Sequence, residues 1–135
     1  MKTSGADGIH GVAPITRRST FEQTYHFAEQ ASRLLERRHP GKLTTEWLKK
    51  KREGVLVDHR QNGHGKTIAS VYSVRPKPGA PVSTPLTWDE VDDKLNPSIY
   101  TMPVVLERVR QLGDVYAPVL TTRQSLSRAL RALGV

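Results

Sequence analysis

A chain of 135 residues is long enough for one domain with one hydrophobic core, and hardly for two. Its 21 lysines and arginines exceed its 13 aspartates and glutamates. The net charge of +8 suggests a polyanionic partner, nucleic acid or a nucleotide first and an anionic membrane surface second, and the alternative is a soluble protein whose surface is merely basic. The absence of cysteine excludes disulfides and thiolate metal sites, and no apolar run is long enough to cross a membrane, so we expect a cytoplasmic protein.

The first part of the chain combines a short apolar segment with one clear helix. Residues 9–15 are typical of a short strand behind a glycine-rich turn. Ser19 and Glu22 have the spacing of a capping box, and apolar residues at helical spacing follow until Pro40, so a long helix is expected here. A short basic helix should come next, capped by a threonine of the pair at 44–45.

A β-hairpin is expected in the middle of the chain. β-Branched residues at 55–58 and 67–73 are typical of strands, and the Asn-Gly pair at 62–63 predicts a turn between them. The proline-rich residues 75–85 lack periodicity and should form a loop.

The last third of the chain predicts helices separated by proline and glycine. Thr87 and Glu90 form a second capping box, for a helix that Pro97 would end. Pro103 and Gly113 are typical of the first position and the end of a further helix, and leucines up to position 133 predict a last amphipathic one. This mixed order predicts an α+β fold with a small antiparallel or mixed sheet packed with helices. Because so small a sheet seldom stands alone, we expect one incomplete domain.

Ser4 and His10 flank a turn that contains Gly5 and Gly8. Such a turn lets backbone N–H groups converge on an anion, and the serine and histidine side chains add donors. A triphosphate is the ligand that this cluster suggests. The alternative is a flexible, glycine-rich segment without a ligand.

Asp58 stands at the end of an apolar segment. Many phosphoryl-transfer sites hold Mg²⁺ with a carboxylate in such a position, and the alternative is an aspartate that opens a turn. The nearby Gly65-Lys66-Thr67 does not complete a phosphate-binding loop, because Arg60 stands where that pattern needs glycine and a strand is expected to follow.

A run of basic residues could contact nucleic-acid phosphates, because each such contact releases condensed counterions. The alternative is a solvated helix face. The run consists of Lys49, Lys50, Lys51 and Arg52.

The order of the motifs resembles the polymerase domain of bacterial DNA ligase D. The motifs are Ser-Gly-x-x-Gly-x-His at 4–10, Thr-Thr-Glu at 44–46, Val-Asp-x-x-Gln-Asn at 57–62, Gly-Lys-Thr at 65–67 and Tyr-Ser-Val-Arg at 72–75. The stretch at 78–88 is similar to that family almost letter for letter. The resemblance covers nearly all of the chain and implies that residues 1–135 are the C-terminal part of an archaeo-eukaryotic-primase-type fold.

The resemblance implies a nucleotidyltransferase that adds nucleotides, often ribonucleotides, to DNA ends during bacterial non-homologous end joining, with Mg²⁺ or Mn²⁺ as its metal. Asp58 would be the third metal-binding carboxylate and therefore a catalytic residue. The implied nucleotide contacts are Ser4, His10 and Arg75 to the triphosphate, Gln61 near the ribose and Lys66 to a phosphate.

Three departures from the family pattern affect this prediction. The Asp-x-Asp motif that supplies two further carboxylates precedes the serine motif in the family, whereas only residues 1–3 precede it here. The aromatic residue usual after His10 and an arginine usual near 100–103 are also missing. We therefore expect the chain alone to be inactive.

As a repair polymerase subunit, the chain would need a complementing N-terminal polymerase chain, and a ligase and a Ku-type end-binding protein are possible further partners at the nucleoid. The alternatives are a non-catalytic module that binds nucleic acid or nucleotide, and a truncated remnant.

Overall fold

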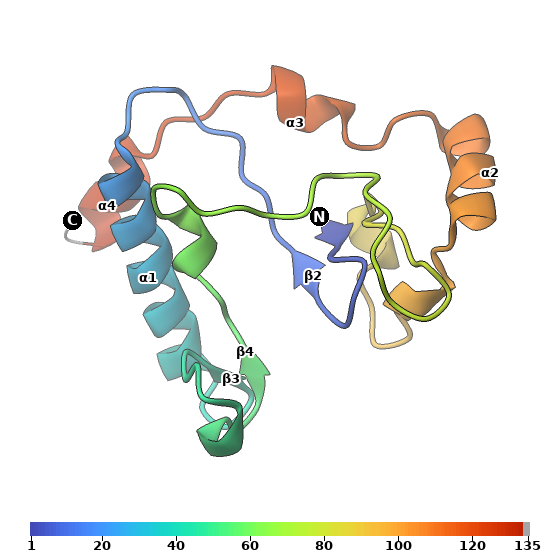
Figure 1. Cartoon of the computed structure of the whole chain (residues 1–135). Helices are drawn as coiled ribbons and strands as arrows, with labels where there is room; N and C mark the ends of the chain where they lie inside the picture. Colours follow the sequence, from blue (N-terminus) through green and yellow to red (C-terminus); the bar gives the residue numbers. More distant parts are fainter. Residues whose placement is uncertain (134–135) are drawn as a thin grey trace. The chain divides into compact units, whose positions relative to one another are not determined.

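The computed structural model describes residues 1–133, which form two compact units. The first unit comprises residues 1–15 and 69–123, and the second comprises residues 16–68 together with the segment that follows residue 123. Each unit combines short strands or extended segments with helices (Figure 1). The α+β class predicted from the sequence is confirmed.

The centre of the first unit is the segment 81–86, in which every residue is buried. On one side lies β1 (Lys2–Thr3), where the backbone N–H of Thr3 donates to the carbonyl of Thr84 at 2.8 Å. On the other side lie residues 72–75, where the backbone N–H of Ser83 donates to the carbonyl of Ser73 at 2.9 Å. β2 (Ile9–His10) pairs antiparallel with the free edge of β1.

Most of the buried groups at this centre are polar. Thr3, Ser83 and Thr84 are completely buried, and each of their hydroxyl groups bonds to a backbone group of the neighbouring segment or of its own. The hydroxyl of Ser83 donates to the carbonyl of Thr3 at 2.8 Å, and the hydroxyl of Thr3 accepts from the N–H of Thr84 at 2.9 Å. Buried polar groups satisfied in this way carry little penalty and fix one arrangement of the strands. The hydrophobic core beside them is small: Val82, Leu86, Tyr100 and Val105.

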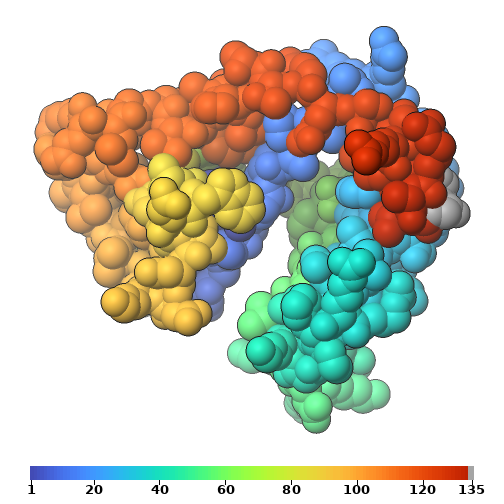
Figure 2. Space-filling view, turned by 180° about the vertical axis from the view of Figure 1, so that it is seen from behind, coloured from blue at the N-terminus to red at the C-terminus, as the bar shows by residue number. Residues whose placement is uncertain are grey.

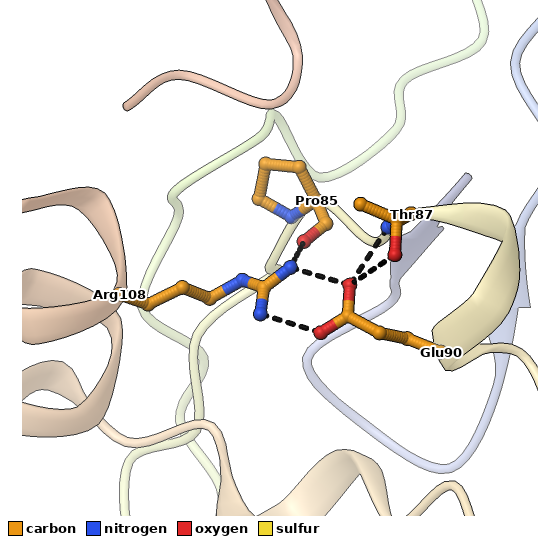
Figure 3. Close-up of polar contacts among 4 residues, drawn as sticks. All are labelled: Pro85, Thr87, Glu90 and Arg108. Carbon is orange, nitrogen blue, oxygen red and sulfur yellow. Dashed lines mark hydrogen bonds and ion pairs between the residues drawn. The ribbon is translucent and has the colours of Figure 1, made fainter. Parts of the chain in front are cut away.

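Helix α2 (Met102–Leu112) is attached to this centre by an ion pair (Figure 3). Both outer nitrogens of the Arg108 guanidinium lie 2.5 Å from the two carboxylate oxygens of Glu90, and one of them also donates to the carbonyl of Pro85 at 3.3 Å. In the space-filling view, α2 in orange packs against the yellow chain segment that carries Glu90 (Figure 2). The helix has proline in its first turn and ends at Gly113, as predicted.

The remaining parts of this unit differ from the prediction. The capping box of Thr87 and Glu90 is present, but it starts only the single turn η3 (Trp88–Glu90). A second single turn, η4 (Pro97–Ile99), stands where the predicted helix was to end. The short helix α3 (Ala117–Thr121) was not predicted, because five residues leave no periodic pattern.

The second unit is built around the long helix α1 (Phe21–Arg38), which packs with η2 (Arg60–Asn62), β3 (Leu43–Thr44) and α4 (Ser127–Leu133) (Figure 1). The capping box of α1 is shifted by one residue from the prediction, to Thr20 and Gln23.

The predicted hairpin in the second unit is wrong. β4 (Val55–Leu56) pairs in parallel with β3, and residues 67–73 form no strand. Gly54 makes this pairing possible, because it has a φ of +81° and a Cβ there would lie 2.5 Å from the carbonyl oxygen of Lys42. The predicted basic helix is only the single turn η1 (Lys49–Lys51). Among the described residues, no helix has the length and hydropathy needed to span a membrane.

We predict that Arg108→Leu lowers the free energy of unfolding by about 2 kcal/mol at neutral pH, because it leaves the Glu90 carboxylate partly buried without its partner. Burial alone would raise the pKa of Glu90, but hydrogen bonds from Arg108 and Thr87 hold it below 4.5. The stabilisation is therefore present above pH 4.5 and is lost as the pH falls through the lowered pKa.

Urea denaturation followed by circular dichroism at neutral and acidic pH tests this prediction. The control is Arg110→Leu on the same helix, whose exposed arginine should contribute at most about 0.5 kcal/mol. Equal losses in the two variants, or a loss that does not shrink in acid, would contradict the role given to the ion pair.

We also predict that the Tyr72 hydroxyl loses its proton only at an unusually high pH. Its hydroxyl donates to the Asp114 carboxylate at 2.6 Å, and burial, followed by that hydrogen bond and charge, raises its pKa to about 12. The contribution to stability is complete below pH 10.0 and is lost as the pH rises towards 12. In an ultraviolet titration, Tyr72→Phe should remove absorbance that appears near pH 12, and Asp114→Asn should shift this absorbance to lower pH. An unchanged titration curve in both variants would refute the assignment.

Candidate functional site

The loop at residues 4–8 closes on the side chain of Ser4. The Ser4 hydroxyl oxygen accepts hydrogen bonds from the backbone N–H groups of Ala6 at 3.1 Å and Gly8 at 3.2 Å. The backbone N–H of Ser4 in turn donates to the carbonyl of Gly8 at 2.8 Å. A hydroxyl oxygen has two lone pairs, so with both of them occupied this hydroxyl can only donate. A phosphate oxygen is the kind of group that such a donor suits.

Arg75 lies directly against this loop. Its guanidinium donates to the carbonyl of Ser4 at 3.0 Å. The close approach requires the glycine at position 5, because Gly5 has a φ of +70° and a Cβ there would lie 2.4 Å from Cγ of Arg75. The structure therefore brings together Ser4 and Arg75, two of the residues predicted to contact one triphosphate.

Lys2 is a neighbour of this loop that the sequence analysis missed. Its side chain is only 2% exposed, and its ammonium group donates to the hydroxyl of Ser83 at 2.6 Å and to the carbonyl of Ala69 at 2.9 Å. Burial, and then the positive charge of Arg75, lowers the pKa of Lys2. Within residues 1–133, neither Lys2 nor Arg75 forms an ion pair with a carboxylate. Two cations lie close together here without a carboxylate bonded to either.

His10 belongs to the same part of the sheet. In the antiparallel pairing of β1 and β2 it stands opposite Lys2, and its side chain is partly buried. Asp7 is the only acidic residue of the loop, and it is exposed. No sequence pattern could have singled out Lys2, because a lysine beside a glycine-rich turn is normally a surface residue and only the strand register buries it.

The second unit carries the other predicted site residues. Asp58 is exposed, and its carboxylate accepts from the backbone N–H of Arg60 at 2.9 Å, so it opens the turn η2. Gln61 lies within this turn and Lys66 follows it, and both are exposed. Among the residues that the structure describes, no three histidine, aspartate or glutamate side chains form a metal-binding group. Asp58 thus supplies one carboxylate, which does not by itself make a site for Mg²⁺ or Mn²⁺.

The basic run divides into two kinds of residue. Lys49, Lys50 and Lys51 are exposed in η1, where their ammonium groups are accessible to a polyanion. The Arg52 guanidinium instead donates to the carbonyls of Glu46 at 3.2 Å and Trp47 at 2.8 Å. Arg52 therefore holds its own loop in place.

Comparison with known proteins points to one family. The model of the LigD primase-polymerase domain matches residues 1–116. The multifunctional non-homologous end joining protein LigD of Pseudomonas aeruginosa is 31% identical over 134 residues, which are 97% of this chain and 16% of that protein. The bifunctional non-homologous end joining protein LigD of Bacillus subtilis is 34% identical over 114 residues, 83% of this chain and 19% of that protein.

A solved structure agrees with these sequence matches. The polymerase domain of Mycobacterium tuberculosis ligase D in complex with DNA matches with a TM-score of 0.69 and 29% identity, over 74% of this chain and 35% of that one. The chain thus spans less than a fifth of these curated relatives and about a third of the solved domain chain. Because the family model covers most of the sequence, the chain belongs to the family of LigD primase-polymerase domains.

Proposed function

We propose that this chain is the part of an end-joining primase-polymerase that binds the phosphates of a nucleoside triphosphate, and that it acts together with the part of the domain that it does not span. The observation that carries the proposal is the loop at residues 4–8. There a hydroxyl restricted to donating lies beside Arg75 and the buried Lys2, neither of which has a carboxylate partner in the described chain.

An anionic ligand such as phosphate suits this arrangement better than a neutral ligand does. Arg75 can offer a planar fork of donors to two phosphate oxygens, and such charge-assisted hydrogen bonds are stronger than neutral ones. Lys2 is too deeply buried to touch a ligand, but its charge adds to the positive potential of the loop. His10 is a further donor on the neighbouring strand.

The proposal gives separate roles to residues of the second unit. Asp58 would be one ligand of a Mg²⁺ or Mn²⁺ ion, the remaining ligands coming from the rest of the domain. Gln61 carries an amide that can both donate to and accept from a ribose hydroxyl, and Lys66 would contact a phosphate. Nucleotide transfer itself would need the missing carboxylates, so we propose no catalysis by this chain alone.

DNA ends are the proposed second partner. The net charge of +8 supports this choice, as does the similar polymerase domain of Mycobacterium tuberculosis ligase D, which was solved in complex with DNA. The exposed lysines of η1 are the proposed backbone contacts. A ligase and a Ku-type protein would act at the same ends near the nucleoid.

A non-catalytic module that binds nucleotide or DNA is the second candidate function. It is consistent with the described residues, among which no three histidine, aspartate or glutamate side chains gather into a metal-binding group. Adding the missing part of the domain separates the two candidates, because only the first predicts that nucleotide addition to a primer then appears and depends on Asp58.

We predict that Arg75→Ala weakens ATP binding by about ten- to hundredfold, because it removes a charge-assisted contact that contributes about 1.5–3 kcal/mol. Arg75→Lys should bind ATP with an affinity between those of wild type and Arg75→Ala, since lysine keeps the positive charge but lacks the planar fork of donors. Asp7→Asn should tighten binding, because it removes the only negative charge of the loop. Isothermal titration of ATP and dATP, with and without Mg²⁺, measures these effects.

The matched control is Arg110→Ala, which removes an exposed arginine of the same unit and should leave the affinity unchanged. Melting temperatures identify any variant whose loop is merely destabilised. If Arg75→Ala binds ATP as tightly as wild type, the loop is not the phosphate site.

We predict that binding of duplex ends weakens steeply with salt, and that replacing Lys49, Lys50 and Lys51 with alanine reduces the log–log slope by about 0.9 for each lysine that contacts a phosphate. The control replaces three basic residues of the other unit, Lys77, Lys94 and Arg110, with alanine, and therefore removes the same amount of positive charge. Fluorescence anisotropy over a series of salt concentrations measures the slope. Equal reductions in the two triple variants would show that only net charge matters, and a slope near zero in wild type would exclude backbone binding.

A further inference from the structure

An apolar groove runs along one face of α2 in the first unit. It encloses about 450 Å³, with Val82 and Val105 of the hydrophobic core at its base. Its rim is formed by the exposed side chains of Met102, Leu106 and Val109 from α2, together with Val74. Leu106 is 60% exposed although it stands one residue after a core position. Apolar side chains gathered in this way mark a surface that another molecule covers.

The polar groups of the groove exclude nucleic acid as its occupant. Its only charged residue is Asp114, which accepts the hydrogen bond from Tyr72. A carboxylate repels phosphate, and the remaining lining is almost entirely aliphatic. The occupant must therefore present an apolar face, as a helix or strand of a protein does.

The comparison with the solved polymerase domain indicates which protein segment occupies the groove. The match covers 74% of this chain but only 35% of that chain, so most of that chain lies outside the match. The core of the first unit contains four buried hydrophobic residues, and a core this small stabilises a unit only marginally. An apolar groove that opens from this core is where further layers of the same domain would continue it.

We propose that the groove on α2 is the surface on which the remaining part of the primase-polymerase domain packs, with apolar side chains inserted beside Leu106 and Val109. The proposal rests on the proposed function, in that it names the complementing partner and its docking surface. It requires neither the phosphate contacts nor the metal ligands to be correctly assigned.

The test mixes the purified chain with the segment of the Mycobacterium tuberculosis polymerase domain that has no counterpart in it, and measures association by sedimentation velocity. The segment of that domain that corresponds to this chain serves as the positive control. Wild type should associate, and Leu106→Glu should weaken association by at least about tenfold, because it places a charge in the apolar contact. Leu106→Ala, which adds no charge, should also weaken association, but by less than Leu106→Glu does.

The matched control is Val104→Glu, on the same helix and 45% exposed but outside the groove, which should change association less than about twofold. Circular dichroism confirms that each variant is folded. The proposal is overturned if Leu106→Glu and Val104→Glu weaken association equally. It is also overturned if the wild-type chain does not associate with the added segment while the positive control does. Self-association of wild type that Leu106→Glu abolishes also overturns it, since the occupant would be a second copy. ATP binding by Leu106→Glu should equal that of wild type, which separates this outcome from failure of the phosphate site.

Discussion

The first unit depends on the segment 81–86 being hydrogen-bonded on both sides while completely buried. Backbone groups taken out of water must all find partners, and here β1 supplies them on one side and residues 72–75 on the other. The hydroxyls of Ser83 and Thr84 fit between these strands because each of them also bonds to a neighbouring carbonyl. A centre built from polar residues is specific in register, because a shift by one residue would leave several donors and acceptors unpaired.

The position of the loop at residues 4–8 follows from this centre. Ser4 directly follows β1, and Arg75 ends the segment on the opposite side, so the strands flanking 81–86 carry both residues to the same place. Lys2 lies beneath them and bonds to Ser83 of the central segment itself. The same hydrogen bonds that hold the sheet therefore determine where the positive charge is concentrated.

The two long helices could be predicted from the sequence to within a residue or two, because α1 and α2 carry their start and stop signals locally, whereas two shorter predicted helices are only single turns. The sheet could not. Residues 81–86 contain two prolines and two hydroxyl side chains, a composition typical of a loop, and only long-range hydrogen bonds make them central. The parallel pairing of β4 with β3 was missed for a similar reason, since local spacing favoured a hairpin. Motif order predicted the candidate site residues, whereas the burial of Lys2 required the strand register.

The hydrogen bonds between β1 and the central segment join residues about 80 positions apart along the chain. Closing a loop of this length is entropically unfavourable, and such contacts slow folding. During synthesis, residues 2–4 could adopt their final conformation only once the segment 81–86 had emerged from the ribosome. The loop at residues 4–8 would accordingly become ordered late, only after a segment about 80 residues further along the chain had been made.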